Sequence, residues 1–169
     1  QAYAIRGMAY TYLPQIYQTY MKQDGTINRE AAGVPIILTQ ADRYTLDELD
    51  ALKGRNTVGQ VLDQAEKDLT AAVENLSAAN YDRPTKNYID LSVAQGLLAR
   101  YYLLTQQWAK AASAANAARQ GYKQRDNEGL HDGFMTLNNP DVMWGFIHTP
   151  ETETTYASYF SHISNLAPG

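Results

Sequence analysis

The chain has 169 residues, of which 44% are hydrophobic, and this is enough for one well-buried domain or two small ones. The formal net charge is −4, with both signs scattered along the chain, which argues against a nucleic acid partner because phosphate binding needs a basic face. There is no cysteine, so disulfides and thiolate metal sites are excluded.

The first predicted helix covers residues 2–20. Apolar side chains recur there at spacings of three and four, which places them on one helix face. Pro14 lies inside this stretch, and an interior proline removes a backbone hydrogen bond at a cost of about 3 kcal/mol or more. We therefore expect a kink at Pro14 or irregular backbone after it.

Residues 21–56 show no sustained period and predict a long insertion after the first helix. They contain one short strand-like run, residues 34–38, and one candidate helical turn, residues 45–49. A loop this long is uncommon inside a compact domain and usually has a task.

The clearest helix covers residues 57–78, because an apolar stripe runs through it and Thr57 with Gln60 predicts a capping box at its start. A third helix is predicted over residues 91–105, with Asp90 as its N-cap.

A fourth helix is predicted over residues 107–121, ending at Gly121. Residues 122–143 are predicted as loop, and residues 144–147 as a short strand or a buried turn. Residues 156–163 are aromatic with an approximate helical period.

The third and fourth helices are joined by a few residues, so they are predicted to be antiparallel neighbours. Their alanines suit close packing of two backbones, and the offsets resemble the tetratricopeptide pattern of small residues and aromatics. The alternative is any alanine-rich antiparallel hairpin. The residues expected in this structural core are Ala99, Tyr102, Trp108, Ala111 and Ala115.

The predicted fold is all-α, with two tetratricopeptide-like antiparallel helix pairs and long loop insertions. Residues 1–121 are the expected helical scaffold, and residues 122–169 are the expected start of an irregular, loop-rich half. The sequence starts in a helix without a recognisable signal peptide, and no apolar run reaches the ~18–20 residues that span a bilayer. We expect the chain to be a piece of a longer protein.

An ordered set of segments resembles the SusD/RagB family of Bacteroidetes outer-membrane lipoproteins. The segments, in chain order, are Ile5-Arg6-Gly7-Met8-Ala9-Tyr10, Gly33-Val34-Pro35, Arg55-Asn56-Thr57-Val58, Asp68-Leu69-Thr70-Ala71-Ala72, Arg83-Pro84-Thr85-Lys86, Leu97-Leu98-Ala99-Arg100-Tyr101-Tyr102-Leu103, Trp108-Ala109-Lys110-Ala111-Ala112 and Asp141-Val142-Met143-Trp144. The resemblance covers nearly the whole chain.

This resemblance implies a surface-exposed subunit, lipid-anchored in the full-length protein, that captures oligosaccharides for a TonB-dependent outer-membrane transporter. It also implies that the helical scaffold faces the SusC-like transporter, and that the protein is a binding protein without a cofactor rather than an enzyme.

Aromatic residues are the best candidates for glycan contact, because sugar rings stack on them through C–H faces. The candidates lie after the repeats: Trp144, His148, Tyr156 and Tyr159. The alternative for Trp144 is a core residue that covers the last helix.

The sequence gives little support for a metal site or for an enzyme that cleaves glycosides. The three histidines lack the close spacing of a zinc site, and no carboxylate pair is singled out for glycoside cleavage. A glycoside-cleaving enzyme is therefore disfavoured. A tetratricopeptide adaptor that binds peptides in its groove is the alternative function, although such adaptors show regular arrays with polar clamp residues.

Overall fold

The structure is a computed structural model that describes residues 1–38, 45, 47–48, 54–131 and 136–146. Within these residues the chain is helical and contains no strand, apart from isolated bridges between Met21 and Ile27 and between Ala32 and Thr57. The predicted all-α class is confirmed. The helices are α1 (Ala2–Tyr17), α3 (Val58–Ala78), α4 (Leu91–Leu104), α5 (Trp108–Ala118) and the short α6 (Asn127–His131).

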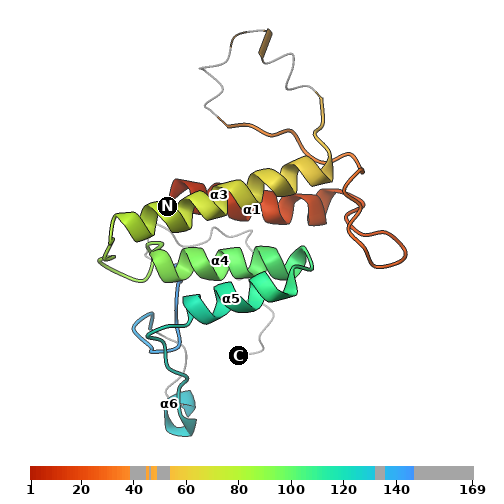
Figure 1. The fold of residues 1–169 in the computed structure, drawn as a ribbon. Helices are drawn as coiled ribbons and strands as arrows, with labels where there is room; N and C mark the ends of the chain where they lie inside the picture. The colour runs from red at the N-terminus through yellow and green to blue at the C-terminus, as the bar shows by residue number, and fades with distance from the viewer. Residues whose placement is uncertain (39–44, 46, 49–53, 132–135, 147–169) are drawn as a thin grey trace, which may run out of the picture.

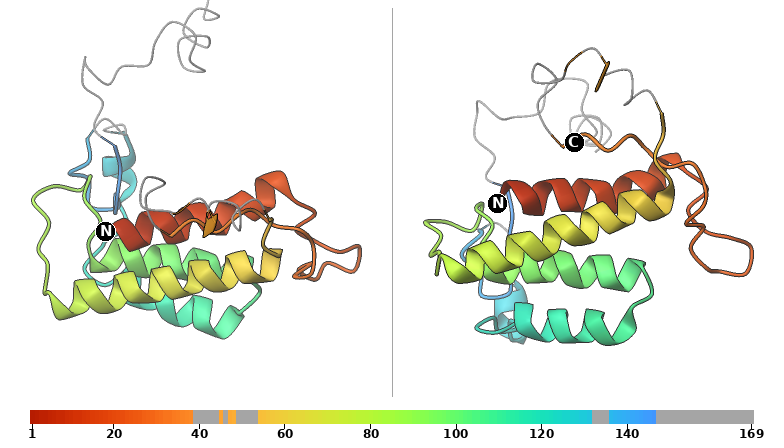
Figure 2. Two further views of the ribbon diagram at one scale, coloured as in Figure 1. Left: turned by 90° about the horizontal axis from the view of Figure 1, so that it is seen from above. Right: turned by 45° about the horizontal axis from the view of Figure 1, so that its top comes forward.

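The four long helices lie side by side, and each runs antiparallel to the one before it (Figure 1). Helix α1 packs on α3, α3 packs on α4, and α4 packs on α5. The helices thus form two consecutive antiparallel hairpins, α1–α3 and α4–α5, joined through α3 and α4 (Figure 2). None of the helices in the described ranges is long and apolar enough to cross a membrane.

Local sequence signals explain where the helices begin. The Thr57 hydroxyl accepts a bond from the Gln60 backbone N–H, and the Gln60 side chain accepts one from the Thr57 N–H, which confirms the predicted capping box of α3. The Asp90 carboxylate accepts from the Val93 N–H at 2.8 Å and caps α4 as predicted.

Pro14 does not break α1, which continues to Tyr17 and stops short of the expected residue 20. The Gln18 N–H bonds to the Pro14 carbonyl at 3.1 Å, so one further turn forms after the proline before the chain becomes extended.

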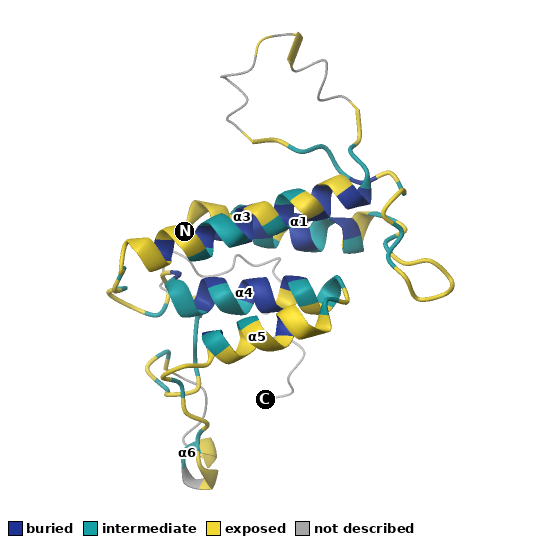
Figure 3. Cartoon of the chain, viewed as in Figure 1, coloured by how far each residue is buried: buried dark blue, intermediate teal, exposed yellow. Residues whose placement is uncertain are grey.

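The core lies between α1, α3 and α4 (Figure 3). Its largest fully buried side chains include Tyr101, Leu62 and Leu69. Helix α1 comes close to α3 at Gly7, because a Cβ atom there would lie 2.7 Å from Leu69 Cγ. Glycine at this position lets the two backbones come together.

The alanine-rich helices α4 and α5 bury fewer of the expected core residues than predicted. Ala99 and Ala111 are buried, and Tyr102 is half-buried against the core. Trp108, however, is 62% exposed, and Ala115 is exposed as well, so assigning these two residues to the core is wrong. The physical reason is that, among the described residues, α5 packs mainly on α4 and contacts α3 through the ion pair of Lys110 with Glu66, so most of its surface stays exposed.

Smaller expectations also differ. Residues 34–38 are extended but pair with no strand among the described residues, and 144–146 are irregular rather than a strand. Helix α6 was not expected, because residues 122–143 were predicted as loop. Of the candidate turn at 45–49, residues 45, 47 and 48 are described: Asp47 and Glu48 are helical, and the Thr45 N–H and hydroxyl donate to the Glu48 carboxylate at 2.7 and 2.8 Å.

Candidate functional site

The insertion between α1 and α3 is fixed to the helices by side chains of α1. Both Nε and Nη2 of Arg6 donate to the buried Asp68 carboxylate, at 2.7 and 2.8 Å, and Nη1 donates to the Leu38 carbonyl at 3.0 Å. This paired, charged hydrogen bonding raises the pKa of Arg6. The Tyr10 hydroxyl donates to the Ile37 carbonyl at 2.9 Å and accepts from the Ile37 N–H at 2.7 Å.

The other side of the insertion is fixed by residues just before α3. Arg55 Nε donates to the Gly33 carbonyl at 2.7 Å, and the Asn56 side-chain oxygen accepts from the Ile36 N–H at 2.9 Å. A Cβ on Gly33 would lie 2.8 Å from the Asn56 carbonyl oxygen, so the two segments approach closely only with glycine there. The segments that carry the family resemblance therefore hold the two ends of the insertion together.

A second polar network joins the α3–α4 link to the chain after α5. Arg83 pairs with Asp90 at 2.8 Å and donates to the Tyr122 hydroxyl at 2.7 Å. Lys86 donates to the Asn139 carbonyl at 2.6 Å, and burial lowers the pKa of its ammonium. This network attaches residues 136–146 to the helical scaffold.

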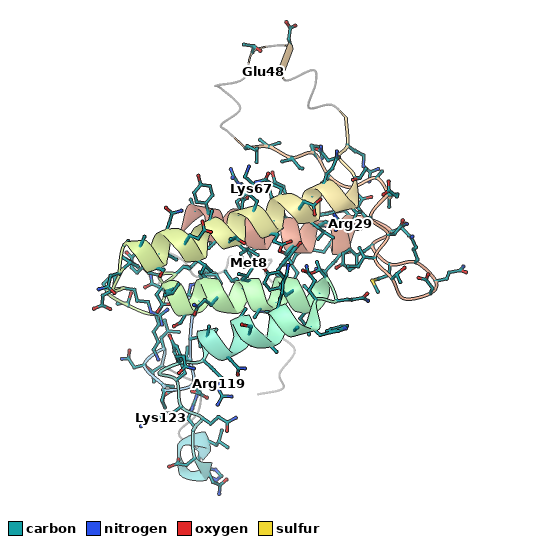
Figure 4. All side chains as sticks on the ribbon, viewed as in Figure 1. Met8, Arg29, Glu48, Lys67, Arg119 and Lys123 are labelled. Carbon is teal, nitrogen blue, oxygen red and sulfur yellow. The ribbon has the colours of Figure 1, made fainter. Side chains whose placement is uncertain are left out.

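A polar pocket of about 780 Å³ opens beside this network, at the C-terminal end of α5. Its walls come from the segment that follows α5 and from the segment that follows α6. Figure 4 shows Arg119 and Lys123 where the chain leaves α5 and runs toward α6. The lining residues are Arg119, Tyr122, Lys123, Gln124, Asp141 and Met143.

Two walls of the polar pocket are held in place. Arg83 binds the Tyr122 hydroxyl, and burial raises the pKa of that hydroxyl, so the phenol stays neutral at physiological pH. Arg125 binds the Asp141 carboxylate at 2.9 Å, and its own side chain is 4% exposed. An aromatic ring, an amide, two cations and a carboxylate therefore face one cavity.

This combination can bind a polar, hydroxylated ligand, because the ring offers a stacking face and the polar groups offer hydrogen bonds. Asp141 is the one carboxylate among the described lining residues, whereas hydrolysis of a glycosidic bond requires a pair. Among the described residues, no three of His, Asp and Glu gather where they could hold a metal ion.

Of the predicted glycan contacts, only Trp144 belongs to the described residues. Its ring packs against the hydrophobic core, and its indole N–H donates to the Asn87 carbonyl at 3.1 Å. The neighbouring Phe146 ring lies 5.3 Å away between centroids and is 71% exposed. His148, Tyr156 and Tyr159 lie outside the described residues, so their role stays a prediction.

The residues of the polar pocket were missed in the sequence. The available signal was the group of cations and one tyrosine directly after the helix-ending alanines, in Arg119-Gln120-Gly121-Tyr122-Lys123. Asp141 and Met143 belong to a segment that carries the family resemblance, but their place in the wall of this pocket could not be predicted, because it depends on how residues 136–146 fold back onto the scaffold.

Comparison with known proteins gives the family. A family model described as "Starch-binding associating with outer membrane", named SusD-like, matches residues 1–103. Among curated protein sequences, none is significantly similar to this chain.

Two solved structures share the fold. A SusD-like carbohydrate binding protein from Bacteroides vulgatus is 26% identical with a TM-score of 0.74, and the match covers 90% of this chain and 30% of that one. A SusD superfamily protein from Bacteroides thetaiotaomicron is 25% identical with a TM-score of 0.58, over 77% of this chain and 26% of that one. The chain therefore spans less than a third of the length of these relatives.

The family model covers more than half of the sequence, and the relative with the higher TM-score has the same arrangement of helices over 90% of the chain. The segments that fix the insertion are the same ones that carry the resemblance in the sequence. On these grounds the chain belongs to the SusD-like family of sugar-binding proteins associated with the outer membrane.

Proposed function

We propose that the protein to which this chain belongs captures oligosaccharides at the bacterial surface and delivers them to a TonB-dependent transporter. The observation that supports it most is the match of residues 1–103 to a starch-binding, outer-membrane-associated family. A lipid anchor on the full-length protein holds it at the outer membrane, and the sugar is bound rather than cleaved.

The polar pocket is the described surface whose chemistry best suits a sugar. Tyr122 offers a ring held by Arg83, and Gln124 with Asp141 offers acceptors and donors for hydroxyls. The expected aromatic contacts, Tyr156 and Tyr159 with His148, complete the site together with the part of the protein that the solved relatives have in addition.

Affinity electrophoresis tests this proposal on a panel of neutral and uronic-acid-containing polysaccharides. We expect retardation of the full-length protein on at least one neutral polysaccharide, with little change between low and high salt, because neutral sugars release no counterions. We expect weak or undetectable retardation of residues 1–169 alone. Hydrolysis of any polysaccharide, or no retardation of the full-length protein on any of them, would count against it.

Matched variants locate the site. Tyr122→Ala and Lys123→Ala should weaken the retardation of the full-length protein. Lys67→Ala removes the same charge from the exposed face of α3, away from the polar pocket, and should leave retardation unchanged. If Lys67→Ala and Lys123→Ala changed the retardation equally, the polar pocket would not be the site of sugar binding.

Delivery requires a contact with the transporter, which we assign to the helical scaffold. Co-purification of the full-length protein with a TonB-dependent transporter from detergent-solubilised outer membranes tests this. If the transporter still co-purifies after substitution of exposed residues of α3, such as Asp63 and Lys67, then this face of the scaffold does not form the contact.

A further inference from the structure

The lining of the polar pocket carries more positive than negative charge. Arg119 and Lys123 are exposed cations near the end of α5 (Figure 4), and neither pairs with a carboxylate among the described residues. Asp141 is the one carboxylate among the described lining residues, and Arg125 already binds it at 2.9 Å. The two cations therefore lack a counter-charge, although the chain as a whole has a formal net charge of −4.

Further cations lie behind the wall of the pocket. Arg83 binds the Tyr122 hydroxyl and pairs with Asp90 at 2.8 Å, so its charge is already balanced. Burial first, and the nearby charge of Arg83 second, lower the pKa of the Lys86 ammonium. Cations are thus gathered at this end of the molecule closely enough to repel one another.

The end of α5 has the opposite polarity but a smaller charge. Its last carbonyl groups amount to roughly half a negative charge, which disfavours an anion nearby. Two cations without a partner outweigh that partial charge. The pocket therefore favours an anionic group over a neutral one.

We propose that the polar pocket selects sugars that carry an anionic group, a carboxylate or a sulfate, over their neutral counterparts. This inference rests on the proposed function, because it concerns the ligand of the same pocket. The planar guanidinium of Arg119 can donate two parallel bonds to a carboxylate or a sulfate, and Lys123 adds a point charge. Tyr122 and Gln124 remain for the ring face and the hydroxyls, so neutral sugars still fit and the anionic group adds to their binding.

The gain in affinity should be modest and sensitive to salt. Both cations are exposed, and ion pairs at exposed sites add only about three- to tenfold to a binding constant. The screening length falls from about 30 Å in 0.01 M salt to about 3 Å in 1 M salt. The preference for the anionic sugar should therefore fade over this range, whereas binding of the neutral sugar should hardly change.

Titration calorimetry of the full-length protein with matched polysaccharides tests the inference. A neutral polysaccharide that retards the protein in affinity electrophoresis is compared with two derivatives, in which part of its primary hydroxyls is oxidised to carboxylates or sulfated. An acidic one is compared with its carboxyl-reduced form. Partial modification distributes the charges along the polymer, so that some of them reach the pocket. We expect the anionic form to bind about three- to tenfold more tightly in low salt and about equally in high salt.

A double variant tests whether the pocket carries the preference. Arg119→Gln with Lys123→Gln removes both charges and keeps groups that form hydrogen bonds, so the preference for the anionic form should disappear. Lys22→Gln with Lys67→Gln is the matched control, because it removes two charges from exposed residues that do not line the pocket. The control should keep the preference of the unchanged protein.

Four results would overturn the inference. Equal binding of the anionic and neutral forms would do so and leave the proposed function standing. A preference that survives in the Arg119 and Lys123 double variant would mean that the anionic group is recognised elsewhere. Competition by poly-L-glutamate as strong as that by the oxidised polysaccharide, at equal carboxylate concentration, would assign the pocket to polyanions in general. If no form of any polysaccharide bound, the proposed function itself would fail, and this inference with it.

Discussion

Helices α3 and α5 are both regular and alanine-containing, yet they differ in how much of each is buried. Helix α3 buries nine of its 21 residues, whereas α5 buries two of its 11. The difference follows from position, because α3 lies between α1 and α4, whereas among the described residues α5 packs mainly on α4. A helical pattern in the sequence defines a face, and the neighbours decide whether that face is covered.

One leucine on each hairpin tests this difference in burial directly. Leu69 on α3 is fully buried, and Leu69→Ala should lower the free energy of unfolding by about 2–5 kcal/mol through lost contacts and a cavity. Leu103→Ala, at a side chain that is 55% exposed, should cost less than about 1 kcal/mol. Urea unfolding of both variants measures the two values, and similar losses would contradict the difference in burial.

Breaking the ion pair of Arg6 and Asp68 on the α1–α3 hairpin should give the next largest loss of stability. Arg6→Met leaves the Asp68 carboxylate, 2% exposed, without its paired partner and should cost about 3 kcal/mol. Arg29→Met breaks the pair with Asp63, whose side chains are 48% and 63% exposed, and should cost less than about 1 kcal/mol.

Thermal and urea unfolding of the two arginine variants test this. Arg6→Met should also loosen the insertion, because the guanidinium holds the Leu38 carbonyl. Faster proteolysis within residues 21–56 in this variant, and not in the Arg29 variant, would be the specific sign. The Gln64 side-chain amide also donates to Asp68 Oδ1, at 3.0 Å, and an Arg6 variant as stable as its control would mean that this bond alone satisfies the buried carboxylate.

These cases show what the sequence could and could not predict. Helix starts were predictable at Thr57 and Asp90, because capping depends on residues three apart. The exposure of Trp108 was not predictable, because the tetratricopeptide pattern assumes that a following repeat covers this position. The polar pocket was missed for a similar reason, since Asp141 reaches it only through the ion pair with Arg125 and the fold of residues 136–146.

Two glycines test how closely neighbouring helices approach each other on the two hairpins. Gly7→Ala should destabilise by about 1–3 kcal/mol, because the added Cβ would lie 2.7 Å from Leu69 Cγ. Gly96→Ala should be neutral or stabilise by up to about 1 kcal/mol, because its Cβ would meet nothing closer than 3.9 Å and alanine favours the helix. The midpoint of urea unfolding should therefore fall for the Gly7 variant and stay unchanged or rise for the Gly96 variant. A loss of stability at position 96 would mean that a Cβ atom there lies closer to its neighbours than 3.9 Å.

The smallest expected effect is at Trp108, where the sequence pattern alone would predict one of the largest. A tryptophan buried in a core costs about 3–5 kcal/mol when truncated to alanine. At 62% exposure, Trp108→Ala in the chain of 169 residues should cost less than about 1 kcal/mol. Urea unfolding of this variant and of the unchanged chain measures the loss, and a loss of about 3 kcal/mol or more would mean that the ring is already buried by α4 and α5 themselves.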